Sequence, residues 1–249
     1  MRYKKEVITM KEIMWNGFSG IEFEFDGRPA YLIKPSCKPN GKWALKTEYW
    51  SHFPEFQVEL LKRGWHIAFN ENRTRLAEPD DLATKVAFIK YISATYGLDK
   101  KCALMGMSCG GLYAVKTAAL CPELISAAWL DAPVMNFLSW PFFVGRPGGE
   151  NKAEEYLEAT GRTLQDMLHY RENPIDKMHI LLENNIPIIL VAGDSDDEVP
   201  YHENGALLEK YYKENGGIIE VHIKRGCGHH PHGPENPAVI ADFFEKYAK

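Results

Sequence analysis

Apolar positions near the start of the chain follow a two-residue spacing. Residues 19–25 are apolar at every second position, as expected for a strand with one buried face. Asp26 and Gly27 separate this segment from a second strand at 28–34, a pairing typical of a tight β-hairpin. With an earlier strand at 6–14, the chain is expected to open with antiparallel strands.

After these strands, short apolar runs alternate with segments in which apolar residues recur at helical spacing. The runs fit buried parallel strands, and the segments between them fit covering helices. The order predicts an α/β domain whose mostly parallel central sheet has about eight strands, with helices on both faces. The expected strands are 65–69, 102–105, 125–130, 187–192 and 218–223, and the expected helices include 79–96, 203–215 and 237–247.

Residues 133–185 interrupt this order, because they contain helical patterns but no convincing strand. An aromatic, turn-rich stretch at 137–149 leads into expected helices at 152–158, 163–169 and 174–183. An insertion after the carboxyl end of a strand is a common way to cover a site. We therefore expect a small helical cap within one domain that spans residues 1–249; an ordinary long crossover is the alternative.

Charge, hydropathy and cysteine content indicate which partners and which compartment to expect. The net charge is −5 and the basic residues are scattered, so we expect no nucleic-acid partner. The chain has no run of about 18 apolar residues, so no membrane partner is expected either. Five cysteines without C-x-x-C spacing, and a basic start without an apolar core, predict a cytoplasmic protein. Composition makes no prediction of the oligomeric state.

The chemistry of the chain is expected to centre on Ser108. It lies in the G-x-S-x-G pattern from Gly106 to Gly110, between an expected strand and an expected helix. A turn this sharp needs small residues on both sides of the serine, and it presents the hydroxyl at the amino end of a helix, where negative charge is favoured. A glycine-rich turn with a solvent-facing serine is the alternative.

An acidic loop follows the strand expected at 187–192. It carries Asp194, Asp196, Asp197 and Glu198 within five positions. A solvated acidic turn is one interpretation. An acid that serves Ser108 is the other.

A histidine-rich loop follows the last expected strand and carries His229, His230 and His232. Three interpretations compete: a catalytic histidine, a metal site built from Cys227 and the histidines, and a surface loop. The first is favoured because the loop follows both the serine turn and the acidic loop. A structural zinc site would need a second cluster of ligands.

With these motifs in order, the chain resembles the α/β-hydrolase superfamily, whose triad follows the order Ser, Asp, His. The family's G-x-x-D-x-x-V-P loop selects Asp196, with Asp194 and Asp197 as second choices. Its G-x-G-H form selects His229, followed by His230 and His232. The resemblance implies an acyl-enzyme on Ser108 and requires no metal and no organic cofactor.

The same resemblance implies an oxyanion hole. One donor is the backbone N–H of Cys109, directly after the serine. The second is expected between residues 35 and 49, in the loop after Lys34, although the His-Gly pair of many esterases is missing there.

The implied activity is hydrolysis of a carboxylic ester, with a small-molecule ester such as an acylated carbohydrate as substrate. Three segments resemble hydrolases of the prolyl-oligopeptidase-like and acetyl-esterase type: Asp-Ala-Pro-Val at 131–134, Ser-Trp-Pro at 139–141 and the histidine loop. The alternatives are a small-peptide serine peptidase and a non-catalytic ligand-binding protein. The residues expected to line the substrate pocket are Trp43, Trp50, Trp140, Phe142 and Phe143.

Overall fold

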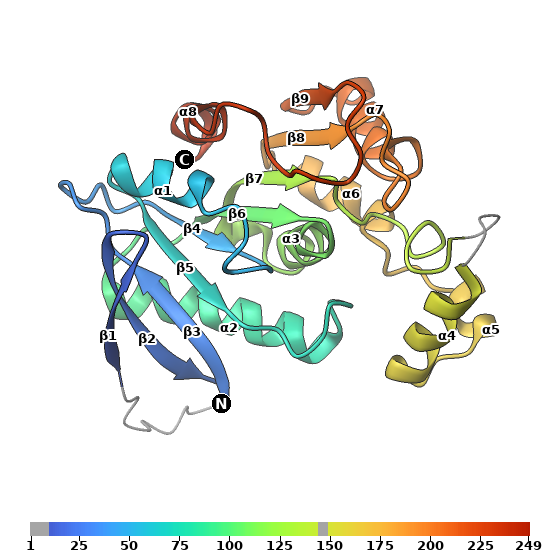
Figure 1. Cartoon of the computed structure of the whole chain (residues 1–249), viewed down its shortest axis with the longest axis horizontal. Helices are drawn as coiled ribbons and strands as arrows, with labels where there is room; N and C mark the ends of the chain where they lie inside the picture. The colour runs from blue at the N-terminus through green and yellow to red at the C-terminus, as the bar shows by residue number, and fades with distance from the viewer. Residues whose placement is uncertain (1–9, 144–148) are drawn as a thin grey trace.

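The computed structural model describes residues 10–143 and 149–249, which form a nine-stranded sheet between two layers of helices (Figure 1). The strand order across the sheet is β1-β2-β3-β5-β4-β6-β7-β8-β9. The strands are β1 (Lys11–Trp15), β2 (Phe18–Phe25), β3 (Arg28–Ile33), β4 (Trp43–Lys46), β5 (His66–Asn70), β6 (Cys102–Met107), β7 (Ile125–Asp131), β8 (Ile188–Gly193) and β9 (Ile219–Lys224).

The helices divide between the two faces of the sheet. Helices α1 and α8 pack on one face, and α2, α3, α6 and α7 pack on the other. The helices are α1 (Glu55–Lys62), α2 (Pro79–Tyr96), α3 (Cys109–Leu120), α4 (Gly149–Thr160), α5 (Leu164–Leu168), α6 (Pro174–Glu183), α7 (Gly205–Glu214) and α8 (Ala238–Tyr247).

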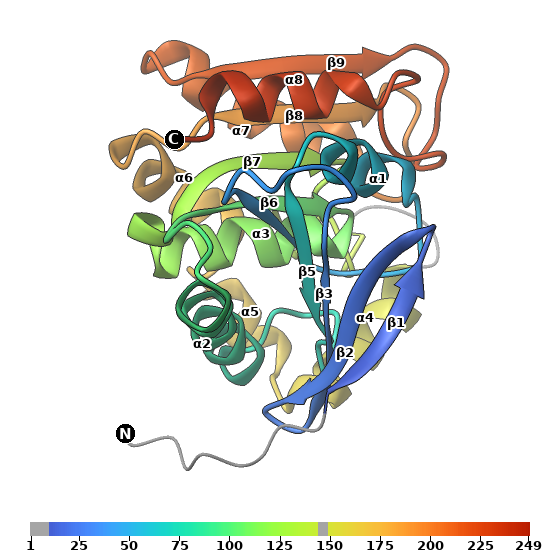
Figure 2. The same ribbon diagram turned by 90° about the vertical axis from the view of Figure 1, so that its left-hand side faces the viewer.

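Strand direction divides the sheet into two parts. Strands β1, β2, β3 and β5 pair antiparallel, whereas β5, β4, β6, β7, β8 and β9 run parallel to their neighbours. Figure 2 shows the strong twist between the β1–β3 end and the β8–β9 end. The parallel strands therefore end at one common edge, where their loops can build a site.

Both faces of the central strands are apolar. Along β4, Leu45 faces the core under α2 and α3, whereas Ala44 faces the core under α1 and α8. Along β6, Leu104 and Ala103 divide in the same way. Burial on both faces explains why these strands are apolar runs rather than alternating patterns.

The predicted α/β-hydrolase fold is confirmed, with one strand more than expected. Sequence reasoning expected only a loop at residues 35–49 and so missed β4, a central strand of only four residues that ends in a lysine. The strand expected at 6–14 begins at Lys11 within the described residues, and its first four positions lie outside them. Within the described ranges, no helix is long and apolar enough to cross a membrane.

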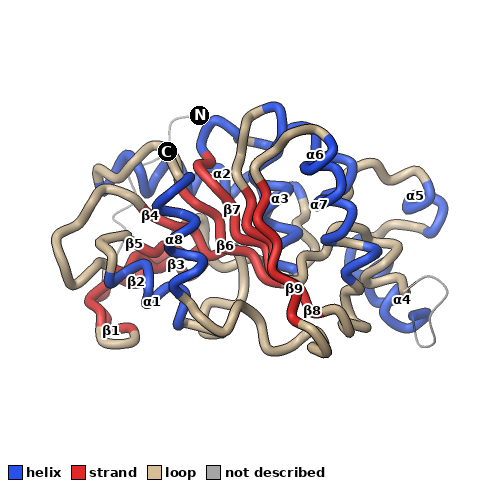
Figure 3. Tube along the Cα trace, turned by 90° about the horizontal axis from the view of Figure 1, so that it is seen from above, coloured by secondary structure: helices blue, strands red, loops and turns tan. Residues whose placement is uncertain are grey.

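The segment expected to form a cap divides into two parts. Helix α6 packs against α3 and covers the sheet, so it is an ordinary crossover helix. Helices α4 and α5 lie beyond the carboxyl ends of the strands (Figure 1), and Figure 3 shows them set apart from the sheet at one end of the molecule. Arg162, between α4 and α5, anchors this part through two bonds of 2.7 and 2.8 Å to the Glu78 carboxylate at the start of α2.

A buried lysine ends strand β4. The side chain of Lys46 is almost fully buried, and its ammonium group donates to the backbone oxygen of His52 across the following loop. Burial lowers the pKa of Lys46 to about 7. The charge of this side chain in the folded protein therefore changes near neutral pH.

This burial predicts how stability depends on pH. Above about pH 7 the unfolded chain holds a proton on Lys46 that the folded chain has lost, so the free energy of unfolding increases with pH up to the ordinary lysine pKa of 10.5. We expect Lys46→Met to remove up to about 1 kcal/mol of this increase per pH unit. Urea denaturation at about pH 7 and about pH 9 measures the effect. Lys62→Met, on a side chain that is 61% exposed, is the control and should keep the wild-type increase. An unchanged increase in Lys46→Met would contradict the assignment.

Candidate active site

Ser108 lies at the sharp turn between β6 and α3. Its backbone has φ 53° and ψ −120°, a conformation that is strained for a residue with a side chain. Three hydrogen bonds stabilise the turn: Ser108 N–H donates to Asp131 O (2.8 Å), and Ser108 O accepts from Gly111 N–H (2.9 Å) and Val134 N–H (3.1 Å). The turn is therefore tied to β7 and to the chain that follows it.

Two glycines make room for this turn. A Cβ atom on Gly106 would lie 2.5 Å from Gly110 O, and one on Gly111 would lie 2.4 Å from the Pro133 Cβ. A Cβ atom on Gly110 would be less crowded, with its nearest contacts at 3.2 Å. The close packing thus falls on Gly106 and Gly111, whereas sequence reasoning gave the main role to Gly106 and Gly110.

His229 lies between Ser108 and Asp196. Its Nε2 atom is 3.0 Å from Ser108 Oγ, and its Nδ1 atom is 2.7 Å from Asp196 Oδ2. A carboxylate next to Nδ1 favours the tautomer that carries the proton there, which leaves the Nε2 lone pair directed at the serine hydroxyl. The three residues come from loops that follow β6, β8 and β9.

Backbone bonds hold the Asp196 carboxylate in place. Its other oxygen, Oδ1, accepts from the N–H groups of Glu198 (2.9 Å) and Val199 (2.8 Å). Asp194 has a different role, since its Oδ1 accepts from Gly226 N–H at 2.7 Å and so joins the acidic loop to the histidine loop. Asp197 is exposed. Of the three candidate acids, the structure brings Asp196 to His229.

A second Asp–His pair lies beside the first and was missed in the sequence. His232 Nδ1 is 2.6 Å from Asp131 Oδ1, and Gly233 N–H donates to Asp131 Oδ2 at 2.6 Å. Both side chains are buried. Asp131 thus holds the histidine loop by its side chain and the Ser108 turn by its backbone oxygen. Its position at the end of a strand, like that of the acidic loop, was the available signal.

The side chain of Tyr49 reaches the serine turn from the loop after β4. Burial raises the pKa of the Cys109 thiol to about 11, and the nearby side chains of Tyr49 and Ser108 partly oppose this rise. Burial, and then the neighbouring thiol, raise the pKa of the Tyr49 hydroxyl well above its ordinary value. Tyr49, at the end of the range expected to supply the second oxyanion donor, therefore lies beside the same thiol as Ser108.

A cavity of about 320 Å³ opens beside Tyr49. Trp50 is the member of the expected substrate pocket that lines it, and its ring stacks on Tyr31 and Phe69 at centroid distances of 5.2 and 5.4 Å. The full lining is Tyr31, Glu48, Tyr49, Trp50, Ser51, His52, Phe69, Glu71 and Asn72.

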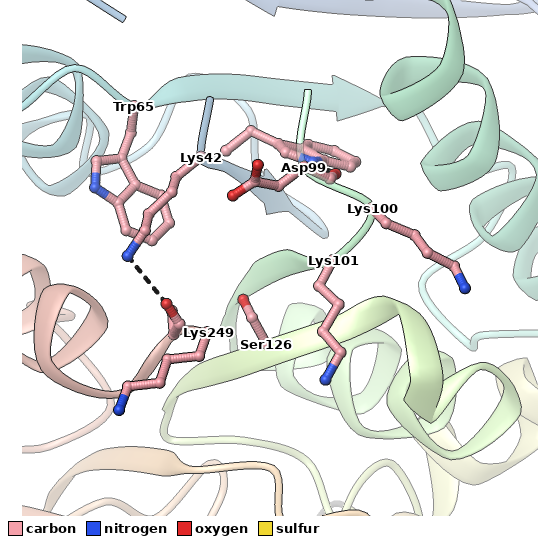
Figure 4. Close-up of a pocket in the computed structure, with 9 residues that line it drawn as sticks. Lys42, Trp65, Asp99, Lys100, Lys101, Ser126 and Lys249 are labelled. Atoms are coloured by element: carbon pink, nitrogen blue, oxygen red, sulfur yellow. Dashed lines mark hydrogen bonds between the residues drawn. The ribbon is translucent and has the colours of Figure 1, made fainter. Parts of the chain in front are cut away.

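Trp43 does not belong to this region, and the expectation that it lines the substrate pocket is corrected. It begins β4, at the opposite edge of the sheet from Ser108, and its buried indole N–H donates to Asp99 O at 2.8 Å. There it lines a separate cavity of about 200 Å³ together with Lys42, Trp65, Lys101 and other residues. Figure 4 shows this cavity, with Lys42 bonded to the backbone oxygen of Ala248. The missed strand β4 caused the error, because Trp43 begins this strand and Tyr49 lies in the loop beyond its other end.

The other expected pocket residues belong to an apolar cluster beside the serine turn. Phe142 is a buried member, and Trp140 packs against it partly exposed. The cluster also contains Cys109 and Val199, the neighbours of the serine and of the acidic loop. Phe143 is buried as well. These aromatic side chains thus lie close to the site but are largely covered.

Comparisons with known proteins agree with this architecture. Residues 63–249 match the prolyl oligopeptidase family. No curated protein sequence matches the chain.

Several solved structures share the fold. A puromycin-hydrolysing peptidase from Mycobacterium tuberculosis is 14% identical with a TM-score of 0.68, and 96% of this chain covers 39% of that one. An acylaminoacyl peptidase from Pyrococcus horikoshii is 14% identical with a TM-score of 0.65, and 99% of this chain covers 43% of that one. The carboxylesterase Cest-2923 from Lactobacillus plantarum is 11% identical with a TM-score of 0.63, over 97% of this chain and 98% of that one.

The chain spans less than half the length of the two peptidases. The family match, by contrast, covers three quarters of this chain and includes the serine turn, the acidic loop and the histidine loop. The chain belongs to the prolyl oligopeptidase family of serine hydrolases with the α/β-hydrolase fold.

Proposed function

We propose that the chain is a carboxylic-ester hydrolase that works through an acyl-enzyme on Ser108. The observation that carries the proposal is the contact of His229 with Ser108 Oγ at 3.0 Å on one side and with Asp196 at 2.7 Å on the other. A hydroxyl, an imidazole and a carboxylate in this order are the parts of a nucleophilic triad.

In the proposed mechanism, Ser108 Oγ attacks the carbonyl carbon of the ester while its proton moves to His229 Nε2. Asp196 accepts a hydrogen bond from Nδ1 and stabilises the imidazolium that forms. His229 then gives the proton to the alkoxide that leaves. Water repeats the two steps on the acyl-enzyme and releases the acid, so that Ser108 regains its proton.

The oxyanion of the tetrahedral intermediate needs two donors. The first is the backbone N–H of Cys109, at the start of α3, where the helix dipole also favours negative charge. For the second we propose the hydroxyl of Tyr49, because its side chain packs against the cluster that contains Cys109, at the serine turn. A tyrosine hydroxyl is a hydrogen-bond donor, and a charged oxyanion is a stronger acceptor than a neutral group.

The proposed substrate is a small ester. A carboxylesterase is among the solved structures that share this fold. The cavity beside Tyr49 offers aromatic rings and carboxylates, which suit an acylated carbohydrate or another small polar ester. A serine peptidase for short peptides is the second candidate, because it uses the same triad.

The direct test compares esters with amides. Purified protein is expected to hydrolyse p-nitrophenyl esters of short acids faster than the p-nitroanilides of amino acids and dipeptides. We expect Ser108→Ala to lose roughly 10⁴–10⁶-fold in kcat and to lose labelling by a fluorophosphonate, because the nucleophile is gone. The exposed Ser195 provides the control, since Ser195→Ala should keep both. Faster release from the anilides would favour the peptidase, and labelling that survives in Ser108→Ala would contradict the proposed nucleophile.

A second prediction separates the three aspartates. Asp196→Asn should lower kcat by roughly 10⁴-fold, because an amide at this position favours the wrong tautomer of His229. Asp194→Asn should mainly lower stability, since its carboxylate bonds Gly226 N–H, and Asp197→Asn should change little. Initial rates and thermal melting of the three variants measure this. Equal losses of rate in all three would mean that the charge of the loop matters rather than one carboxylate.

Tyr49→Phe tests the second oxyanion donor. We expect kcat to fall by roughly 10²–10³-fold with little change in KM, because the lost bond acts in the transition state. Steady-state kinetics with a p-nitrophenyl ester measures both constants. The control is Tyr211→Phe in helix α7, which removes a tyrosine hydroxyl outside the proposed site and should keep the wild-type kcat. A normal kcat in Tyr49→Phe would direct the search to a backbone donor of the same loop.

A further inference from the structure

Three histidine rings meet beside the serine turn. The centroids of His229, His230 and His232 are 4.8 to 4.9 Å apart, and their planes are inclined by 71° to 81°. One ring nitrogen of each lies within 4.8 Å of those of the other two. The proposed mechanism uses only His229. In that mechanism the rings of His230 and His232 transfer no proton.

Two of these rings are oriented as metal-binding histidines usually are. Asp196 takes Nδ1 of His229, and Asp131 takes Nδ1 of His232. A carboxylate on one ring nitrogen fixes the tautomer and makes the other nitrogen a better ligand, an arrangement common behind protein-bound zinc. The Nε2 atom of each ring is thereby left with a lone pair that could bind a metal ion, and in His229 this lone pair faces the Ser108 hydroxyl.

The three histidines differ in their exposure to solvent. It is the exposed member of the three, whereas His232 is buried and His229 lies between these extremes. Phe53 backs the cluster, with its ring parallel to His230 at 6.3 Å and edge-on to His232 at 5.4 Å. An ion can therefore reach the histidines from the His230 side without passing through the core.

We propose that His229, His230 and His232 bind a divalent transition-metal ion, with Zn²⁺ as the physiological ion, and that this binding inhibits the enzyme. Three imidazoles suit Zn²⁺, Co²⁺ and Ni²⁺ rather than Mg²⁺ or Ca²⁺, which prefer oxygen ligands. With metal–nitrogen bonds of about 2.0–2.1 Å, the three nitrogens need to be about 3.3 Å apart. The three nitrogens therefore need to move closer together on binding, and the exposed His230 side chain has the most room to move.

Inhibition is expected because the proposed metal ligand His229 is also the base of the proposed triad. This part of the proposal rests on the function proposed above. His229 Nε2 is 3.0 Å from Ser108 Oγ, and it is the nitrogen that accepts the serine proton. A metal ion on this nitrogen occupies the lone pair and lies between the base and the nucleophile. Ser108 then keeps its proton, and acylation stops until the ion leaves.

Binding is tested without reference to activity. The full chain is titrated with Co²⁺, and the visible d–d bands of a tetrahedral ion are followed. We expect saturation at one ion per chain, displacement of Co²⁺ by Zn²⁺, and no displacement by Mg²⁺. His230→Gln, at an exposed position that leaves both Asp–His pairs intact, should weaken Co²⁺ binding by roughly tenfold or more. The matched control is His222→Gln in β9, which should bind as the wild type does.

Inhibition is tested separately. Zn²⁺ should suppress hydrolysis of a p-nitrophenyl ester, and EDTA should restore it. In His230→Gln the zinc concentration for half-inhibition, relative to the variant's own uninhibited rate, should rise by the same factor as its loss of Co²⁺ affinity.

The outcomes distinguish the site from the proposed function. Absence of a saturable Co²⁺ spectrum, or equal spectra in the wild type and His230→Gln, would overturn the site. Saturable binding with full activity in Zn²⁺ would overturn the inhibition. A protein without esterase activity would refute the proposed function, and the Co²⁺ titration would still decide the metal site.

Discussion

The strained backbone of Ser108 is the constraint on which the rest of the site depends. With φ 53° and ψ −120°, the serine holds its position only because neighbouring elements bind it on both sides. Asp131 O accepts from its N–H group, and its own oxygen accepts from Gly111 and Val134. Gly106 and Gly111 leave the space that this packing requires. The parallel order of β6 and β7 thus stabilises a turn that the local sequence alone would not hold.

Two Asp–His pairs share the edge of the sheet beside this turn, and they differ in burial. The Asp131 and His232 pair is closed off from solvent and anchors the histidine loop to the end of β7. The Asp196 and His229 pair is partly open and faces the serine. The buried pair therefore positions the loop from which the open pair works. Because the His230 ring lies within 4.9 Å of both histidine rings, the loop also gathers three rings that we propose bind a metal ion.

Two buried lysines bond backbone oxygens in the region of the loop after β4. Lys46 ends that strand and bonds the far side of the loop through His52 O, while Lys85 of α2 donates to Asn70 O at the end of β5. Burial lowers the pKa of Lys85 to about 7 as well. These ammonium groups bond backbone oxygens that the core would otherwise leave unpaired. Lys46 thus bonds across the loop that carries Tyr49, and Lys85 bonds the end of the neighbouring strand β5.

The α/β class, most of the helices and strands, and the three loops of the site could be predicted from the amino-acid sequence, because a strand, a glycine-rich turn and a helical spacing are local signals. Which side chains meet depends on long-range packing. The family motifs put Asp196 and His229 first among their neighbours, but only the fold brings His229 to Ser108, which lies 121 positions before it, and Asp196 to His229. Trp43 was misplaced for the same reason. Whether a residue lies at the amino or the carboxyl end of a short central strand depends on the pairing of that strand with segments far along the chain.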